Sequence, residues 1–105
     1  MPTKLRIGFA DFQVVSDPSL DGQLIEDGLA GASNGNLLKI AVRSDMPATI
    51  KAETLLHEVL HQCLYAAGQN NSQKIEEPIV RAMSMALFSV LRDNPDFVKY
   101  LLHQE

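Results

Sequence analysis

The stretch "SDMPATIKAETLLHEVLHQCLYAAG" (residues 44–68) predicts the longest helix of the first two thirds of the chain. Ser44 or Asp45 can cap its N-terminus. Pro47 is tolerated in the first turn, because its missing N–H would have no helical partner there. Gly68 can adopt the left-handed conformation that often ends a helix. We therefore expect a helix that begins at about Pro47 and ends just before Gly68.

The polar residues of this helix are concentrated on one side. At about 100° per residue, His57, His61 and Glu58 fall within one arc of about 100°, so all three share a face. Two imidazoles one turn apart can both reach a single ion. An apolar stripe lies elsewhere on the helix and is predicted to face the core; it consists of Leu56, Leu60, Cys63, Leu64 and Ala67. Cys63 is expected to be a small buried hydrophobe, with the histidines bordering the stripe where a cleft can form.

Residues 57–61 read H-E-x-x-H, a pattern whose spacing suits zinc hydrolysis. Zinc in a hydrolase takes three protein ligands and keeps a fourth position for water, whose pKa falls to about 7. A neighbouring carboxylate can take a proton from that water and pass it to the leaving nitrogen, and Glu58 is placed for this role. Tyr65, one turn after His61, is a candidate for stabilising an oxyanion at the rim, with packing as the alternative. The competing interpretation of the motif is the polar edge of an ordinary amphipathic helix.

A third metal ligand must come from outside this helix. The candidates are Glu76 and Glu77 in "KIEEPIV" (residues 74–80) and His103 near the C-terminus. An antiparallel second helix, joined by a short polar loop, would bring the two glutamates towards the histidine pair. Glu76 lies in line with the apolar face of that helix and Glu77 at its margin, so the residue pattern leaves both open. The glutamate that is not used has the common role of an acidic residue at a helix N-terminus.

The rest of the chain predicts an α+β fold. Residues 3–15 alternate in two pieces that a bulge or turn near Ala10 and Asp11 would reconcile. "SDPSLDG" (residues 16–22) is typical of a surface connection. Asn34-Gly35 predicts a hairpin with a type I′ turn, followed by a half-buried strand that includes Ile40.

The C-terminal third is predicted to be helical. A second helix is expected over about residues 76–93, and Asn94-Pro95 ends it. A short helix follows through Leu101 and Leu102. We therefore predict a small N-terminal sheet of about three strands, packed on the motif helix, an antiparallel second helix and a short third helix. Met83, Met85 and Phe88 are expected to fill a core or an interface.

Composition narrows the class of protein. The chain has 105 residues, of which 46% are hydrophobic, which suits one domain over residues 1–105. The net charge of -4 provides no basic surface for a nucleic acid, and no apolar run is long enough for a membrane span. The single cysteine, Cys63, excludes an internal disulfide and a multi-cysteine zinc site. We expect a cytoplasmic protein that binds neither nucleic acid nor membrane.

The segments "TLLHEVLHQ" and "EEPIVRAMSMALFSVLRDNP" resemble the small phage-encoded metallopeptidase-like proteins with a minimal gluzincin fold, and more distantly the metalloprotease domains of the ImmA/IrrE type. The resemblance covers roughly residues 36–102. It implies zinc bound by His57, His61 and Glu77, with Glu58 as the general base and Glu76 as the alternative third ligand. Two residues depart from the family pattern. Pro78 limits how far the second helix can extend upstream, and Arg81 occupies a position where gluzincins commonly carry an acidic residue.

Three functions remain in competition. The leading one is a zinc-dependent peptidase that acts on a peptide or protein substrate and binds it along an exposed sheet edge, for which the strand at residues 37–44 is the candidate. The alternative is a non-catalytic module, such as a phage accessory or protein-interaction module, in which zinc only stabilises a small fold. The third is a metal-free homo-oligomer held together by its helices.

Overall fold

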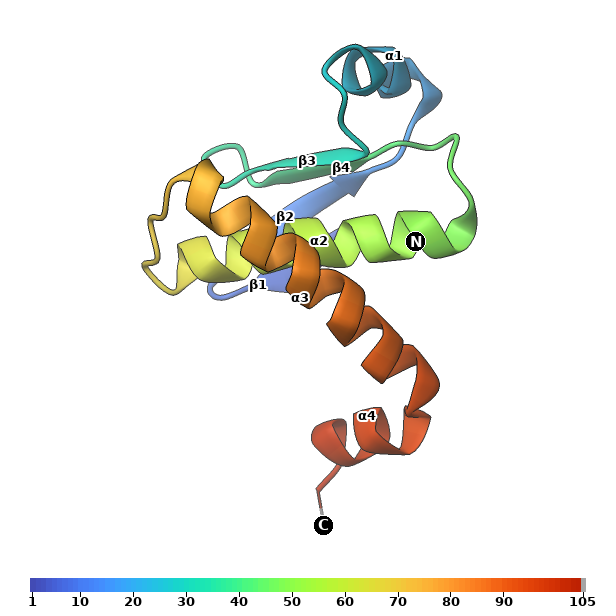
Figure 1. Ribbon diagram of the computed structural model, residues 1–105, viewed down its shortest axis with the longest axis vertical. Coiled ribbons are helices and arrows are strands. Elements are labelled where there is room, and N and C mark those ends of the chain that lie inside the picture. Colours follow the sequence, from blue (N-terminus) through green and yellow to red (C-terminus); the bar gives the residue numbers. More distant parts are fainter. Residues whose placement is uncertain (105) are drawn as a thin grey trace.

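The computed structural model describes residues 1–104 and has the α+β architecture that the sequence predicts. The four strands are β1 (Lys4–Ile7), β2 (Ala10–Val15), β3 (Gly31–Asn34) and β4 (Lys39–Val42). The four helices are α1 (Pro18–Glu26), α2 (Ala48–Ala66), α3 (Gln73–Asp93) and α4 (Pro95–Leu102). The strands form one sheet in the order β1-β2-β4-β3, in which β2 and β4 run parallel and the other neighbours antiparallel. Helix α2 lies along the sheet, α3 crosses α2, and α4 lies at the far end of α3 (Figure 1).

The first hairpin turns two residues earlier than predicted. β1 and β2 pair antiparallel, and Ile7 lies opposite Ala10, so the turn is Gly8-Phe9 and not Ala10-Asp11. Gly8 has a φ of 61°, a conformation that glycine adopts without steric cost at the first central position of a tight hairpin. Phe9 is 86% exposed at the tip, which is why it does not continue the alternation of the first strand.

The second hairpin is present, but its turn differs from the predicted type I′. β3 and β4 pair antiparallel with Asn34 opposite Lys39, which leaves a four-residue connection. The Asn34 side chain accepts hydrogen bonds from the backbone N–H groups of Asn36 (2.9 Å) and Leu37 (3.1 Å). Within this hairpin the positive φ belongs to Leu38 (55°). Because β4 lies between β2 and β3, the edge strands of the sheet are β1 and β3, and the strand at residues 37–44 is not at an edge.

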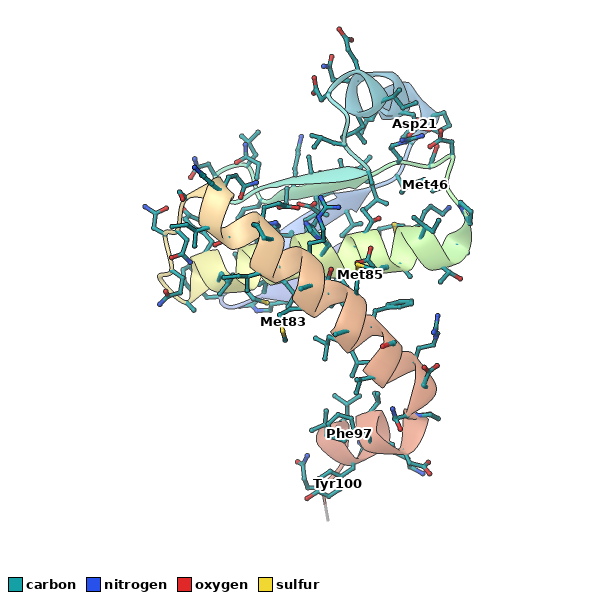
Figure 2. The ribbon with its side chains drawn as sticks, in the orientation of Figure 1. Asp21, Met46, Met83, Met85, Phe97 and Tyr100 are labelled. Carbon is teal, nitrogen blue, oxygen red and sulfur yellow. The ribbon has the colours of Figure 1, made fainter. Side chains whose placement is uncertain are left out.

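The segment expected to be a surface connection contains helix α1. Asp17 caps it by accepting a hydrogen bond from Ser19 N–H (2.9 Å), and Pro18 occupies the first helical position. An Asp-Pro pair can therefore begin a helix as well as a turn, and the prediction of a surface connection without a helix is wrong for this segment. Asp21 is 9% exposed and accepts hydrogen bonds from the backbone N–H (2.8 Å) and hydroxyl (2.6 Å) of Ser44. This pair joins α1, where Asp21 is labelled in Figure 2, to the segment that precedes α2.

Helix α2 has nearly the predicted bounds. Gly68 has a φ of 80°, and the following N–H bonds the carbonyl of Leu64 (2.9 Å), as expected for a glycine that ends a helix. Neither predicted N-terminal cap is used, because Ser44 bonds Asp21 and Asp45 forms an ion pair with Arg43 (2.8 Å).

The face that α2 buries is not the predicted apolar stripe. The core of the sheet consists of Ile7, Phe12, Val14, Ile40 and Val42. Leu55 and Val59 of α2 pack against it. Cys63, expected to be buried, is exposed. The buried residues of α2 are instead polar: Thr54, Glu58, His61 and Gln62. The prediction failed because α2 contacts both the sheet and α3, and the side facing both carries the polar residues.

Helix α3 begins three residues before the predicted start and continues through Pro78. Its first turn is held by the backbone N–H groups of Ile75 (3.0 Å) and Glu76 (2.9 Å), which both bond the carbonyl of Ser72. Val80 is buried as expected, whereas Met83 and Met85 are 53% and 62% exposed and fill no core. Helix α4 has the predicted position. Over the described residues, no helix is long and apolar enough to cross a membrane.

Candidate metal centre

Three side chains from α2 and α3 converge on one point. His57 Nε2 lies 2.8 Å from Glu77 Oε1, and His61 Nε2 lies 2.7 Å from Glu77 Oε2. One ligand atom from each residue lies within 4.8 Å of the others, a grouping that could hold a metal ion. The one-turn spacing on α2 aims both imidazoles the same way, and α3 returns across α2 to supply the carboxylate (Figure 1). His103, the third candidate from the sequence, directly follows the C-terminal end of α4 and is not in the group.

Glu76 contacts the same imidazole from its other side. Its Oε2 lies 2.6 Å from Nδ1 of His61, and both side chains are almost buried, with exposures of 11% and 10%. A carboxylate accepts but does not donate when ionised, so this contact favours the tautomer with the proton on Nδ1. Glu77 faces Nε2 in the same way, so the metal-free imidazole is favoured as a cation with a proton on both nitrogens, and a metal ion would replace only the proton on Nε2. Glu76 and Glu77 thus have different roles at one histidine, an arrangement that the sequence alternatives did not include.

The outer nitrogen of His57 faces a hydroxyl. Ser84 Oγ lies 3.4 Å from Nδ1 of His57 and donates a hydrogen bond to Glu53 Oε1 (2.8 Å). Ser84 is completely buried, so its hydroxyl needs these partners. Neither Ser84 nor Glu53 was a sequence candidate. The signal was their spacing, because Ser84 lies seven residues after Glu77 and Glu53 four before His57, which places each on the same face as the ligand.

Glu58 is held between α2 and the edge strand. It is 8% exposed, and its Oε1 accepts a hydrogen bond from Ser33 Oγ of β3 (2.8 Å). Gln62 Nε2 donates in turn to Ser33 Oγ (2.8 Å), which completes the hydroxyl's partners and fixes the orientation of the amide. Burial raises the pKa of Glu58, and the Ser33 hydrogen bond together with the positive charges of His57 and His61 offsets part of that rise. Sequence patterns did not indicate Ser33 or Gln62.

The charge state of His61 depends on its two carboxylate partners. Burial by itself lowers its pKa, but the hydrogen bonds with Glu76 and Glu77 outweigh burial, and the pKa lies above the ordinary value for histidine. In the metal-free protein the imidazole is therefore held as a cation to a higher pH than usual. A metal ion at Nε2 would compete with that proton.

The metal group opens into a cavity of about 820 Å³ between β3, α2 and the start of α3. Tyr65 lies at its rim and is 53% exposed; a Cβ at Gly35 would be only 2.5 Å from the tyrosine ring. Among the described residues that line the cavity, Arg81 is the single lysine or arginine, and its guanidinium lies 3.5 Å from Glu77 Oε1. Thr54 is buried, and its methyl group lies against Gly31.

The donor set fits a borderline divalent cation. Two neutral imidazole nitrogens and one carboxylate oxygen are a ligand combination typical of catalytic zinc, which leaves a fourth position for solvent. The outer partners Glu76 and Ser84 orient both histidines in the manner that metal-bound histidines require. Comparison with protein-family models, with curated proteins and with solved structures finds no match for this chain.

Proposed function

We propose that the protein is a zinc-dependent peptidase in which His57, His61 and Glu77 hold the metal and Glu58 is the general base. The observation that supports this most is the convergence of three ligand atoms within 4.8 Å, with Glu58 lining the same cavity. The same arrangement supports grouping the chain with the minimal gluzincins that its motif resembles.

Bound zinc would polarise the scissile carbonyl and lower the pKa of a coordinated water. Glu58 would take a proton from the attacking water and deliver it to the leaving nitrogen. Ser33, itself held by Gln62, donates to one oxygen of Glu58, which leaves the other available for this transfer. Glu76 holds the Nδ1 proton of His61, so that Nε2 remains a ligand. Tyr65, at the cavity rim, is the proposed donor to the oxyanion, a role that its exposure permits.

Strand β3 is the proposed docking edge for the substrate. Its outer side has no neighbouring strand in the sheet, and its residues line the cavity that contains the metal group. An extended peptide can pair with such an edge through main-chain hydrogen bonds. Because Ser33 of β3 bonds Glu58, a peptide on this edge would pass directly by the general base.

Two variants and one control test the proposal. Protein purified without added metal is expected to contain about one zinc per chain by elemental analysis. Glu58→Gln should retain the metal and lose cleavage of a peptide library, whereas His57→Ala should lose the metal. His103→Ala is the matched control, because it removes a histidine outside the group and should leave the metal content unchanged. Unchanged metal in His57→Ala would rule the site out.

A second function, a non-catalytic module stabilised by zinc, is favoured by one contact. Arg81 approaches the same Glu77 oxygen that faces His57, which competes with the metal for that oxygen. In that case chelation would lower the melting temperature while no peptide in the library is cleaved. Arg81→Gln, which removes the competing charge, would then raise zinc affinity without producing turnover.

A further inference from the structure

Helix α3 has a second long face that no other element of the described chain covers. Its inner face carries Glu76, Val80 and Ser84 towards α2. Beside this inner face, an arc of about 120° contains no charged residue until Asp93, the last residue of the helix. We call it the outer stripe; it consists of Ile75, Ile79, Ala82, Met83, Ala86, Ser89 and Val90. Its four large side chains are 43–62% exposed, which is unusual for a helix of this apolar content.

The spacing within the outer stripe is that of a helix-pairing seam. Ile79, Met83, Ala86 and Val90 follow one another at intervals of four, three and four residues. This is the 3.5-residue repeat by which one helix keeps the same face towards another. Helix α2 does not occupy this seam, because it packs on the side of Val80 and Ser84.

Helix α4 extends the uncovered apolar surface. It is eight residues long and has no buried residue. Its large apolar side chains Phe97, Leu101 and Leu102 are 45%, 48% and 69% exposed. An isolated helix of this length is marginal in water, so an ordered α4 needs a packing partner. Met83 projects from the side of α3 that faces α4, and Met85 from the other side (Figure 2). The outer stripe and α4 therefore form the two sides of one open angle.

We propose that this angle is the site of a two-fold dimer in which a second copy of the chain places its own α3 and α4 against the outer stripe. An antiparallel arrangement centred near Ala82 and Met83 pairs the seam with itself. It also brings α4 of each chain to the N-terminal half of the partner's α3, where Ile75 and Ile79 are exposed. The metal cavity lies on the side of Arg81 and Met85 and stays open.

The exposed area is sufficient for this partner. Seven large side chains on the outer stripe and α4, each about half exposed, offer roughly 600 Å² of apolar surface per chain. A stable interface buries about 800 Å² per partner, of which about 450 Å² is non-polar. The seam itself is uncharged, so neither a basic nor an acidic partner is selected. At the end of α3 and in α4, the positive charges of Arg92 and Lys99 equal in number the negative charges of Asp93 and Asp96. The net charge of -4 is therefore not concentrated at the contact.

The first test is the molar mass of the full chain by light scattering on a size-exclusion column, over about 1–200 µM and with chelator present. The expected mass is twice 11.6 kDa at the higher concentrations. Met83→Glu should yield a monomer. Met85→Glu is the matched control, because it makes the same change two residues away at similar exposure but outside the seam, and it should remain dimeric. A wild-type monomer throughout, or a dimer unaffected by Met83→Glu, would overturn the proposal.

A milder variant covers the case in which Met83→Glu unfolds. In a Cys63→Ser background, Ala82→Cys places a single thiol close to the two-fold axis, where two Cβ atoms about 4 Å apart can form a disulfide. Mild oxidation should link this variant to itself within minutes, while Met85→Cys in the same background stays unlinked. Equal cross-linking of both variants would mean random collision and would refute the arrangement. Both tests are independent of zinc, so they can fail while the peptidase proposal stands.

Discussion

Replacing Glu76 by Gln should weaken zinc binding about tenfold without removing the site. The carboxylate lies 2.6 Å from Nδ1 of His61, and both side chains are about nine-tenths buried, so water cannot substitute for it. Outer partners of metal-bound histidines typically contribute 10–100-fold to affinity. Gln keeps an oxygen that accepts the Nδ1 proton and loses only the charge, which corresponds to about 1.4 kcal/mol. Glu76→Ala leaves a buried N–H unpaired, so its loss should be nearer 100-fold, about 2.7 kcal/mol.

The assay is competition for zinc against a chromophoric chelator at pH 7.5 and 0.15 M salt. Asp93→Asn is the control for net charge, because it removes one exposed carboxylate at the far end of α3. It should bind zinc like the wild type. Glu77→Gln should lose far more affinity than Glu76→Gln, since it removes a ligand oxygen. If Glu76→Gln bound zinc as tightly as the wild type, or if the order of the two glutamates were reversed, the assignment of roles at His61 would be wrong.

Three further predictions concern pH and packing. The pKa of His61 is raised in the folded state, so its protonation contributes stability that is complete below pH 6.5 and is lost as pH rises through the folded pKa. Thermal melts of chelated protein should therefore show a melting temperature that falls from pH 6 to pH 8. The variant His61→Gln should flatten this fall. Gly31→Ala would place a Cβ 2.8 Å from the Thr54 methyl group and should cost about 1–3 kcal/mol in urea unfolding, whereas an unchanged midpoint would show that α2 can move away from β3. Asp21→Ala leaves the partly buried N–H and hydroxyl of Ser44 without these acceptors and should cost about 1–3 kcal/mol, measured in the same way. A loss below 0.5 kcal/mol, about the size of an ordinary surface change, would contradict the role of this pair.

The elements that carry strong local signals were predictable. Gly68 marked the end of α2, Asn94-Pro95 separated α3 from α4, and Asn34-Gly35 located the second hairpin. In each case the deciding interaction lies within a few residues of the signal. The H-E-x-x-H spacing placed His57 and His61 on one face for the same reason, because the geometry of a helix is local.

Predictions that depended on tertiary contacts fared worse. Helix α1 was missed because its stabilising pair, Asp21 with Ser44, joins residues 23 apart. The partners of Glu58 and His57 were missed for the same reason, since Ser33 comes from another strand and Ser84 from another helix. A sequence pattern can state which face of a helix a residue occupies, but not which element will cover that face.

The failure of the helical wheel on α2 is itself informative about function. A wheel places the apolar residues inside, yet α2 directs Glu58, His61 and Gln62 into the junction between the sheet and α3. Burying such groups costs free energy unless each has a partner, and the chain supplies partners from β3 and α3 for all of them except Gln62 Oε1. Apolar residues at these positions would need no hydrogen-bond partners and would give a more stable junction. A chain that keeps acids and imidazoles there, and supports them with hydroxyls, amides and a further carboxylate, bears this cost where the proposed metal site would need those groups.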